Sequence, residues 1–210
     1  MSHATAPPAL LLLAAGASSR LGQPKQLLPY RGQTLLRRAA ETAAASGCRP
    51  LVLITGARHD ELLPEVADLP FQVVRNEAWA EGLGASVRAG MAALAAYTPA
   101  LAQTSPAAVL LMLCDQPLLT AAHLHELLRV QRASGRAAVA SAYAGTAGVP
   151  AVFGPALFGQ LRALRGAGGA RPLLASLPPA ELATVDFAAG IVDVDTPAQY
   201  EQLLAAKSEE

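Results

Sequence analysis

Two cationic side chains follow a segment of small residues directly after the first apolar run of the chain. Residues 14–25 read AAGASSRLGQPK. Small side chains let backbone N–H groups approach a polyphosphate closely, with no Cβ in the way at Gly16, and Arg20 and Lys25 can neutralise phosphate charge. The segment is neither a Walker A loop nor G-x-G-x-x-G. The residues predicted to contact a nucleoside triphosphate here are Ala14, Ala15, Gly16, Ser18, Ser19, Arg20 and Lys25.

An aspartate ends the most hydrophobic run of the sequence. Val109–Leu113 is followed by Cys114 and then by Asp115, Gln116 and Pro117. A carboxylate at the end of a central strand can hold Mg²⁺ against triphosphate oxygens, since Mg²⁺ prefers oxygen ligands. The same aspartate could instead cap a helix beginning near Thr120 or stabilise the turn at the proline. The strand and the aspartate alone leave both interpretations open, and the loop at 14–25 favours metal binding.

A third polar stretch lies at residues 76–90, which read NEAWAEGLGASVRAG. Gly82 and Gly84 indicate a backbone that passes close to a ligand, and Ser86 is expected at a helix N-terminus, where N–H donors are free. Ordinary helix capping by Ser86 would give the same pattern. Trp79 could touch a substrate, but a single tryptophan is more typical of packing.

Strand-like and helical runs alternate along the chain and must position these residues. The expected strands are 9–13, 51–55, 71–75, 109–113, 137–142 and 191–194. The expected helices are 34–46, 59–63, 84–96 and 121–133, with a surface loop at 97–106 and a frayed tail at 207–210. The alternation predicts an α/β fold with one doubly wound, mainly parallel sheet flanked by helices. The apolar strands suit a sheet that helices cover on both faces.

Length and composition limit the classes of protein to consider. The 210 residues suffice for a single domain over 1–210, and 52% of them are hydrophobic. Sixteen basic and sixteen acidic residues balance, which argues against a nucleic-acid partner. The first apolar run is too short for a membrane span. Cys48 and Cys114 are expected as buried free thiols, which favours a cytoplasmic location. Together with the charge balance and the short apolar run, this predicts a protein without a nucleic-acid or membrane partner.

The combination of strand, A-A-G, S-x-R and P-K over residues 10–25 resembles the signature loop of the GT-A-like nucleotidyltransferases, which have a Rossmann-like fold. The D-Q-P tripeptide at 115–117 resembles the molybdenum cofactor cytidylyltransferase branch of that group. The resemblance extends from Leu10 to about Leu204. It implies an NTP-binding part at about 9–120, an acceptor-binding part at about 121–204, and Asn76, Gly84 and Ser86 as base and ribose contacts.

The C-terminal third supplies the other residues that the resemblance implies. Residues 148–153 are similar to the G-x-P-x-x-F segment that lines the acceptor pocket, which implies acceptor contacts at Gly148 and Pro150, and Arg171 is a further candidate. The D-x-D-T-P stretch implies Asp195 as the second metal carboxylate beside Asp115, with Asp193 as its alternative on the same face of a strand. Asp195 could also cap the helix that opens at Pro197.

The sequence departs from the family pattern at one acidic position. Where relatives have Gly-Asp-x-Gly-Ala-Arg, residues 166–171 read GAGGAR, with Ala167 in place of the aspartate. An altered acceptor affinity or a different acceptor would follow if that carboxylate orients the acceptor.

The implied reaction transfers CMP from CTP to the phosphate of the molybdopterin cofactor, with Mg²⁺ as cofactor and release of pyrophosphate. Lys25, Arg20 and Asp115 are the expected catalytic residues, and a molybdenum hydroxylase apoenzyme is an implied recipient of the product. Ala15 at the middle of A-A-G favours CTP over GTP, since guanylyltransferase relatives carry glycine there. Two alternatives stay open: an NTP transferase for another phosphorylated acceptor, such as a sugar or methylerythritol phosphate, and a cofactor carrier without catalysis. No Ser/His or Cys/His pair for covalent catalysis is recognised.

Overall fold

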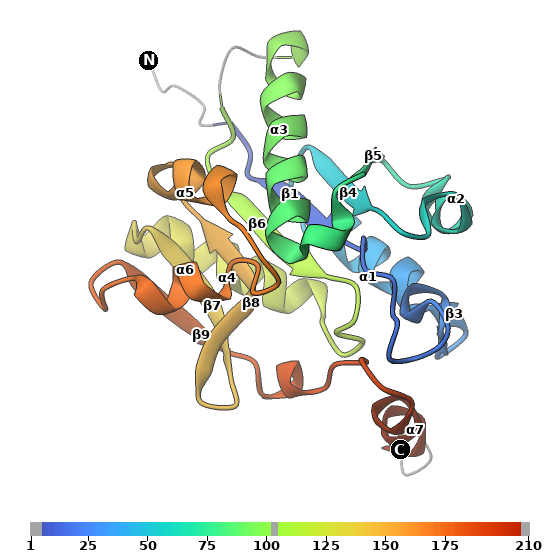
Figure 1. The fold of residues 1–210 in the computed structure, drawn as a ribbon. Helices are drawn as coiled ribbons and strands as arrows, with labels where there is room; N and C mark the ends of the chain where they lie inside the picture. Colours follow the sequence, from blue (N-terminus) through green and yellow to red (C-terminus); the bar gives the residue numbers. More distant parts are fainter. Residues whose placement is uncertain (1–5, 102–104, 207–210) are drawn as a thin grey trace.

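A seven-stranded sheet forms the centre of the protein, which the computed structural model describes over residues 6–101 and 105–206 (Figure 1). Its strands are, in chain order, β1 (Ala9–Leu13), β4 (Leu51–Thr55), β5 (Phe71–Arg75), β6 (Val109–Leu113), β7 (Ala138–Tyr143), β8 (Thr146–Phe153) and β9 (Leu182–Asp186). In space they follow the order β5-β4-β1-β6-β8-β7-β9. A separate hairpin pairs β2 (Pro29–Tyr30) with β3 (Gln33–Thr34).

Most neighbouring strands are parallel, which confirms the predicted mainly parallel sheet. Within the seven-stranded sheet, β8 runs antiparallel to its neighbours β6 and β7. β1 and β6 pair in register from Ala9 with Val109 to Leu13 with Leu113. Both strands therefore end at the same edge of the sheet, and the loop after β1 and the turn after β6 begin side by side.

Helices cover both faces of the sheet. They are α1 (Leu35–Ala44), α2 (His59–Leu62), α3 (Leu83–Leu101), α4 (Ala121–Ser134), α5 (Phe158–Ala163), α6 (Arg171–Ser176) and α7 (Pro197–Ala205), with short 3₁₀ turns at Lys25–Leu27, Leu63–Val66, Trp79–Glu81, Pro155–Leu157 and Ala188–Ile191. Buried residues of α1 and α4 form one apolar core with one face of the sheet. Buried residues of α3, α5 and α6 form another with the opposite face.

The strand β1 contributes to both cores because successive side chains point to opposite faces. Leu10 and Leu12 belong to the core under α1 and α4, and Leu11 and Leu13 to the core under α3. This arrangement explains why the strand is apolar at every position instead of alternating. Cys48 and Cys114 are buried free thiols, as predicted.

The C-terminal segment crosses the lower edge of the sheet in Figure 1 and returns to the N-terminal half of the chain. Val194 and Leu203 pack with Leu21, Leu28 and Tyr30 in a third apolar cluster. The Tyr200 hydroxyl donates a hydrogen bond to the Pro29 carbonyl over 2.6 Å. Residues near the end of the chain are thereby fixed beside the loop that follows β1.

The structure corrects two of the predicted elements. No strand forms at 191–194: the Val192 N–H bonds to Ala189 and the Val194 N–H to the Asp115 carbonyl, so these backbone groups leave the sheet ladder. The strand of this region is β9 instead. The loop predicted at 97–106 is helical as far as Leu101, because α3 continues through it; residues 102–104 and the tail at 207–210 lie outside the described residues.

The other expected elements are confirmed within a few residues of their predicted bounds. Thr34 caps α1 by accepting a hydrogen bond from the Arg37 N–H, and Thr120 caps α4 in the same way from His123. The cap near Thr120 is thus the threonine itself and not Asp115. Among the described residues, we find no helix with the length and apolar character needed to cross a membrane.

Candidate active site

The predicted loop and the predicted metal carboxylate meet where the strand order reverses. β1 lies between β4 and β6, and the two neighbours are reached by connections on opposite faces of the sheet. Open α/β sheets bind ligands at such a switch point, outside the carboxyl ends of the strands. Residues 14–20 leave β1 at this point and Asp115 follows β6, so the fold brings the two predicted motifs together.

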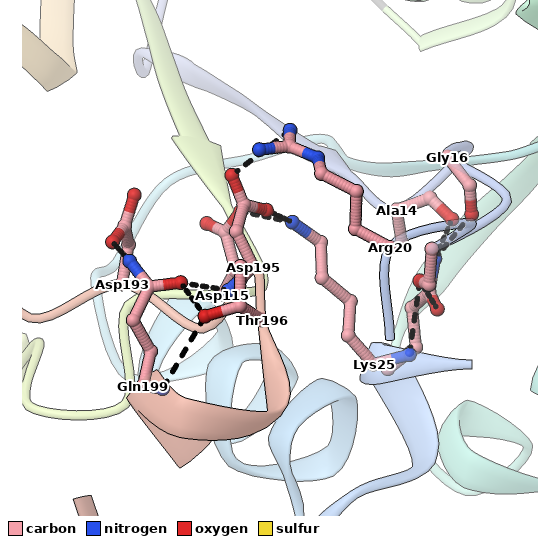
Figure 2. A network of polar contacts seen from close by, with 11 residues as sticks. Ala14, Gly16, Arg20, Lys25, Asp115, Asp193, Asp195, Thr196 and Gln199 are labelled. Atoms are coloured by element: carbon pink, nitrogen blue, oxygen red, sulfur yellow. Dashed lines mark hydrogen bonds and ion pairs between the residues drawn. The ribbon is translucent and has the colours of Figure 1, made fainter. Parts of the chain in front are cut away.

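Lys25 occupies the centre of the carboxylate cluster (Figure 2). Its Nζ lies 2.6 Å from Asp115 Oδ2 and 2.6 Å from Asp195 Oδ1. The side chains of the lysine and of Asp115 are only 16% and 12% exposed. Arg20 approaches the same Asp195 carboxylate from solvent, with 3.4 Å between Nη2 and Oδ2. The structure therefore joins the predicted cations to both predicted metal carboxylates, over sequence separations of 90 and 170 residues.

A buried glutamine fixes the conformation of the loop, and the sequence analysis missed it. The Gln26 amide donates to the carbonyls of Ala14 and Gly16 over 3.0 and 2.8 Å. The Ser18 hydroxyl donates to Gln26 Oε1 and accepts from the backbone N–H of Lys25. These bonds close the loop into a ring from which Lys25 projects. The available signal in the sequence was a polar residue, Gln26, directly after the P-K pair and directly before two leucines.

Charge and burial act in opposite directions on the pKa values of Lys25 and Asp195 and mainly in the same direction on that of Asp193. Burial disfavours the Lys25 ammonium and would lower its pKa. The negative charge of Asp115 and the hydrogen bonds of Lys25 to Asp115 and Asp195 outweigh burial, so the pKa of this lysine lies above its ordinary value. Burial alone would raise the pKa of Asp195, yet the hydrogen bond and charge of Lys25 hold it below the ordinary value. Burial, reinforced by the charges of Asp115 and Asp195, raises the pKa of Asp193.

The donor set fits a hard divalent cation that is completed by its substrate. Over residues 6–101 and 105–206, no group of three or more His, Cys, Asp or Glu side chains is arranged to hold a metal ion alone. Asp115 and Asp195 nevertheless offer oxygens that already share one cationic group, and Asp115 Oδ1 is buried without a hydrogen-bond partner among the described residues. Mg²⁺ is commonly held by one or two carboxylates together with substrate phosphates.

Two adjoining cavities open at this edge of the sheet. The nucleotide cavity, as we name it, measures about 340 Å³ and is lined by Ala14–Gly16, Ser18–Arg20, Lys25, Asp115 and Asp195, among others. The acceptor cavity measures about 380 Å³ and is lined by Gly148 and Arg171, among others. Leu13, Leu83, Leu113 and Asp193 line both cavities. A group bound in one can therefore meet a group bound in the other at this shared wall.

The acceptor cavity is bounded by apolar side chains and by loop backbone. Leu111, Val87 and Val149 are among its walls, and residues 167–171 close one side. Of the predicted acceptor contacts, Gly148 and Arg171 reach the cavity, whereas Pro150 is buried behind it, with its carbonyl accepting from Ser141 Oγ. Gly148 packs tightly, since a Cβ there would lie 2.4 Å from the Tyr143 hydroxyl.

The residues predicted from the 76–90 stretch lie together but are used within the protein. Asn76 Nδ2 donates to Ser86 Oγ over 3.2 Å, and both residues are buried. The Gly84 N–H donates to the Gly166 carbonyl, and a Cβ on Gly84 would lie 2.8 Å from the Arg165 backbone. The close backbone approach inferred from these glycines is thus to the 165–167 segment. Ser86 lies inside α3 and is not its cap.

A buried Ser–His pair also escaped the sequence analysis. His123 Nε2 lies 2.8 Å from Ser141 Oγ, and the serine hydroxyl donates to the Pro150 carbonyl. Ser141 is fully buried and its proton is directed to a carbonyl, so the pair ties α4 to the sheet and is not arranged as a nucleophile. Burial also lowers the pKa of His123.

Comparison with curated proteins gives three informative relatives. The chain is 41% identical over 119 residues to nicotine blue oxidoreductase of Paenarthrobacter nicotinovorans, covering 56% of this chain and 54% of that protein. It is 28% identical over 213 residues to the purine catabolism protein PucB of Bacillus subtilis, covering 94% and 96%. It is 35% identical over 85 residues to the molybdenum cofactor cytidylyltransferase of Escherichia coli, covering 40% and 44%.

Solved structures with the same fold cover almost the whole chain. The structure of Rv0371c from Mycobacterium tuberculosis is 31% identical and superimposes with a TM-score of 0.77, covering 96% of this chain and 98% of that one. A second structure of Rv0371c, 29% identical with a TM-score of 0.73, is a complex with manganese and covers 95% and 99%.

The family itself is given by a model of the MobA-like NTP transferase domain, which matches residues 10–182. These residues include the loop after β1, Lys25 and Asp115, and they make up most of the chain. The protein belongs to the MobA-like NTP transferase family and is a nucleotidyltransferase of the GT-A-like fold.

Proposed function

We propose that the protein transfers CMP from CTP to the phosphate of the molybdopterin cofactor and releases pyrophosphate. The single observation that supports this proposal is the pair of adjoining cavities, one lined by the loop after β1 with Lys25, Asp115 and Asp195 and the other by mainly apolar side chains with Arg171. A transferase needs both substrates in contact, and the shared wall provides that contact.

The reaction is a displacement at the α-phosphorus of CTP. An oxygen of the acceptor phosphate forms a bond to this phosphorus, and the bond from it to the bridging oxygen of the β-phosphate breaks, so pyrophosphate leaves with both electrons of that bond. Lys25 and Arg20 neutralise the charge that gathers on the triphosphate oxygens. The acceptor phosphate is ionised at neutral pH, so no general base is needed. Catalysis then rests on positioning and on electrostatic stabilisation.

Asp115 and Asp195 are the residues that would hold Mg²⁺. When bound, the ion supplies charge neutralisation at the phosphates and orients them for displacement. Lys25 Nζ bonds to both of these carboxylates. Its side chain must therefore exchange these partners for phosphate oxygens when CTP and the ion enter.

The choice of CTP and of the acceptor is supported by the loop sequence and by one relative. Ala15 lines the nucleotide cavity, where cytidylyltransferases of this group carry alanine and guanylyltransferases tend to carry glycine. The Escherichia coli molybdenum cofactor cytidylyltransferase is similar over 85 residues. The apolar acceptor cavity suits a flat heterocycle better than a polyhydroxylated sugar. The proposal includes a cytoplasmic location, with a molybdenum hydroxylase apoenzyme receiving the product.

The test is pyrophosphate release from CTP, GTP, ATP and UTP, each with Mg²⁺ and with or without purified molybdopterin cofactor. Release that needs both CTP and the cofactor supports the proposal. Selectivity for GTP keeps the transfer chemistry and overturns the choice of base. Release with a sugar phosphate or methylerythritol phosphate in place of the cofactor overturns the acceptor. Tight binding of the cofactor without release from any nucleotide favours a carrier.

Reduction of a heterocyclic substrate is a second candidate, because the protein is 41% identical over 119 residues to a nicotine blue oxidoreductase. It predicts consumption of an added electron donor, with two-electron reduction of the heterocycle, and no pyrophosphate release. The Lys25–Asp115–Asp195 cluster favours transfer, since cations and metal carboxylates serve phosphate chemistry. The reductant assay, run beside the pyrophosphate assay, separates the two candidates.

A further inference from the structure

Two aspartates that stand two residues apart are held by different partners. Asp195 Oδ1 lies 2.6 Å from Lys25 Nζ, inside the nucleotide cavity. Asp193 Oδ1 instead accepts a hydrogen bond from Gln199 Nε2 over 2.9 Å. Figure 2 shows Asp193 on the other side of the cluster from Lys25. Because 191–194 is not a strand, the two carboxylates are free to point into different surroundings.

The side-chain amide of Gln199 forms hydrogen bonds at both its oxygen and its nitrogen, one to the backbone of Asp195 and one to the side chain of Asp193. Its Oε1 accepts from the Asp195 backbone N–H and from the Thr196 hydroxyl over 3.1 and 2.9 Å. The Thr196 hydroxyl in turn accepts from the Gln199 N–H, which completes a form of capping box at the start of α7. A glutamate would serve this cap equally well. Only a glutamine leaves an N–H to donate to Asp193, so the cap alone does not account for this residue.

Asp193 lies where the cavities meet. It lines the nucleotide cavity and the acceptor cavity, whereas Asp195 lines only the former of the two. Of the described residues around the acceptor cavity, Asp193 and Arg171 are the charged ones. A carboxylate held at the wall of a mainly apolar pocket, which Arg171, Tyr143 and Thr146 also line, is a strong hydrogen-bond acceptor for a buried donor group. A molecule in this pocket that presents a ring N–H or a hydroxyl toward the shared wall would find its partner there.

We propose, building on the proposed function, that Asp193 hydrogen-bonds a donor group of the acceptor while Asp195 serves the metal. Gln199 is a positioning residue that holds Asp193 toward the acceptor cavity and away from Lys25. Of the two aspartates of the DxD pair, one thereby contacts the acceptor and the other binds the metal ion that accompanies the nucleotide. The donor group is a ring N–H if the acceptor is a pterin and a hydroxyl if it is a polyol phosphate.

The test measures equilibrium binding without turnover. Wild type, Asp193→Ala and Asp195→Ala are titrated with purified molybdopterin cofactor and with methylerythritol phosphate, followed by pterin fluorescence and by calorimetry. Mn²⁺ binding to the CTP-loaded proteins is measured separately by electron paramagnetic resonance. We expect Asp193→Ala to weaken acceptor binding about tenfold to a hundredfold, as for loss of a hydrogen bond to a charged group. Asp195→Ala should weaken Mn²⁺ binding and leave acceptor binding within about twofold of wild type.

Gln199→Glu tests the positioning role, with Gln202→Glu as its matched control. Both substitutions add one negative charge to the same helix. Gln202 lines a third cavity with Asp193 and Gln199, but its side chain takes no part in the hydrogen bonds that hold the two aspartates. Gln199→Glu keeps the acceptor atoms of the cap but places a carboxylate against Asp193. We expect acceptor binding to weaken by about tenfold in Gln199→Glu, with CTP binding unchanged and the thermal midpoint lowered by about 2 °C or less through the repulsion of the two carboxylates, and no loss of acceptor binding in Gln202→Glu.

The outcomes separate this inference from the proposed function. If Asp193→Ala weakens Mn²⁺ binding and spares the acceptor, the roles are reversed and the inference is overturned. Binding of neither acceptor by wild type overturns it as well. If wild type binds only methylerythritol phosphate and Asp193→Ala loses that binding, the inference stands and the proposed acceptor is wrong.

Discussion

The nucleotide cavity and the acceptor cavity share a wall but are built in different ways. The nucleotide cavity carries Arg20, Lys25 and three aspartates, and most of its lining comes from two short segments that directly follow β1 and β6. The acceptor cavity has Asp193 and Arg171 as its charged residues among those described, and its walls come from many separate elements. The first is suited to charge chemistry and the second to recognition by shape, as expected when one substrate is a triphosphate and the other a ring system.

The largest expected effect is on catalysis, from Asp115→Ala. Loss of this carboxylate removes the proposed metal ligand that has the unpartnered buried oxygen, so we expect the turnover rate to fall by about 10³-fold or more. Lys25 keeps Asp195 as a partner, so the thermal midpoint should change little. The measurement is pyrophosphate release at saturating CTP and Mg²⁺, beside a circular dichroism melt. Turnover like that of wild type would remove Asp115 from the mechanism.

Lys25→Met tests whether one cation serves both the triphosphate and the carboxylates. We expect CTP affinity to fall by about a hundredfold while cytidine affinity is unchanged, because the lost contact is to phosphate. Nucleotide-free protein should at the same time bind Mn²⁺ more tightly than wild type, since the ammonium no longer competes for Asp115 and Asp195. Calorimetry measures all three affinities. Equal losses for CTP and cytidine would contradict the phosphate role.

Gly16→Ala and Gly84→Ala form a matched pair that tells the cavities apart. A Cβ on Gly16 meets nothing within 4 Å, so its free energy of unfolding should change by less than about 1 kcal/mol while the KM for CTP rises. A Cβ on Gly84 would lie 2.8 Å from the Arg165 backbone, which borders the acceptor-cavity loop. We expect this variant to lose about 1–3 kcal/mol in urea unfolding and to bind the acceptor more weakly. The reverse pattern would show that Gly84 faces the nucleotide.

Ala167→Asp restores the acidic residue of the family pattern inside the acceptor cavity. The added charge opposes an anionic acceptor, so we expect the acceptor KM to rise several-fold, an effect of the order of 1 kcal/mol, with the KM for CTP unchanged. Steady-state kinetics with each substrate varied in turn measures both constants. A lower acceptor KM would show that the acceptor presents a donor group at this position.

The smallest effects are on stability. At pH 7, replacing Asp195 and replacing Asp193 with asparagine should shift the thermal midpoint in opposite directions. The pKa of Asp195 is lowered, so its ionised form stabilises the folded protein above the unfolded-state pKa of about 3.9 and this contribution is lost as pH falls. Asp195→Asn should therefore lower the thermal midpoint at pH 7, and by less at pH 3. The pKa of Asp193 is raised, so its ionised form is unfavourable and Asp193→Asn should raise the midpoint at pH 7. We expect shifts of about 2 °C or less. Shifts of the same sign would contradict the division of roles.

The comparison of the cavities also explains what the sequence predicted well. Lys25, Arg20 and Asp115 lie in local motifs at strand ends, and the parallel pairing of β1 and β6 alone brings those ends together. The strands β1, β4 and β6 were predicted because their apolar runs are continuous.

Other features depend on contacts that no local pattern encodes. The partnership of Asp195 with Lys25 spans 170 residues and is fixed by the packing of Val194, Leu203 and Tyr200 against the N-terminal half. The apolar run at 191–194 looks like a strand, but its backbone bonds are taken by Asp115 and Ala189. The sequence also does not show that Gly82 and Gly84 pass close to the 165–167 segment, because that segment lies far along the chain; their contact with a ligand stays a prediction.

Transfer of the nucleotidyl group itself is the most direct measurement. CTP labelled at its α-phosphate is incubated with the protein, Mg²⁺ and purified molybdopterin cofactor, and the products are separated and counted. The account predicts that the label moves to the cofactor in amounts equal to the pyrophosphate released, and that Asp115→Ala abolishes the transfer. Label that stays with CTP while wild type binds both substrates would contradict nucleotidyl transfer as the function of this site.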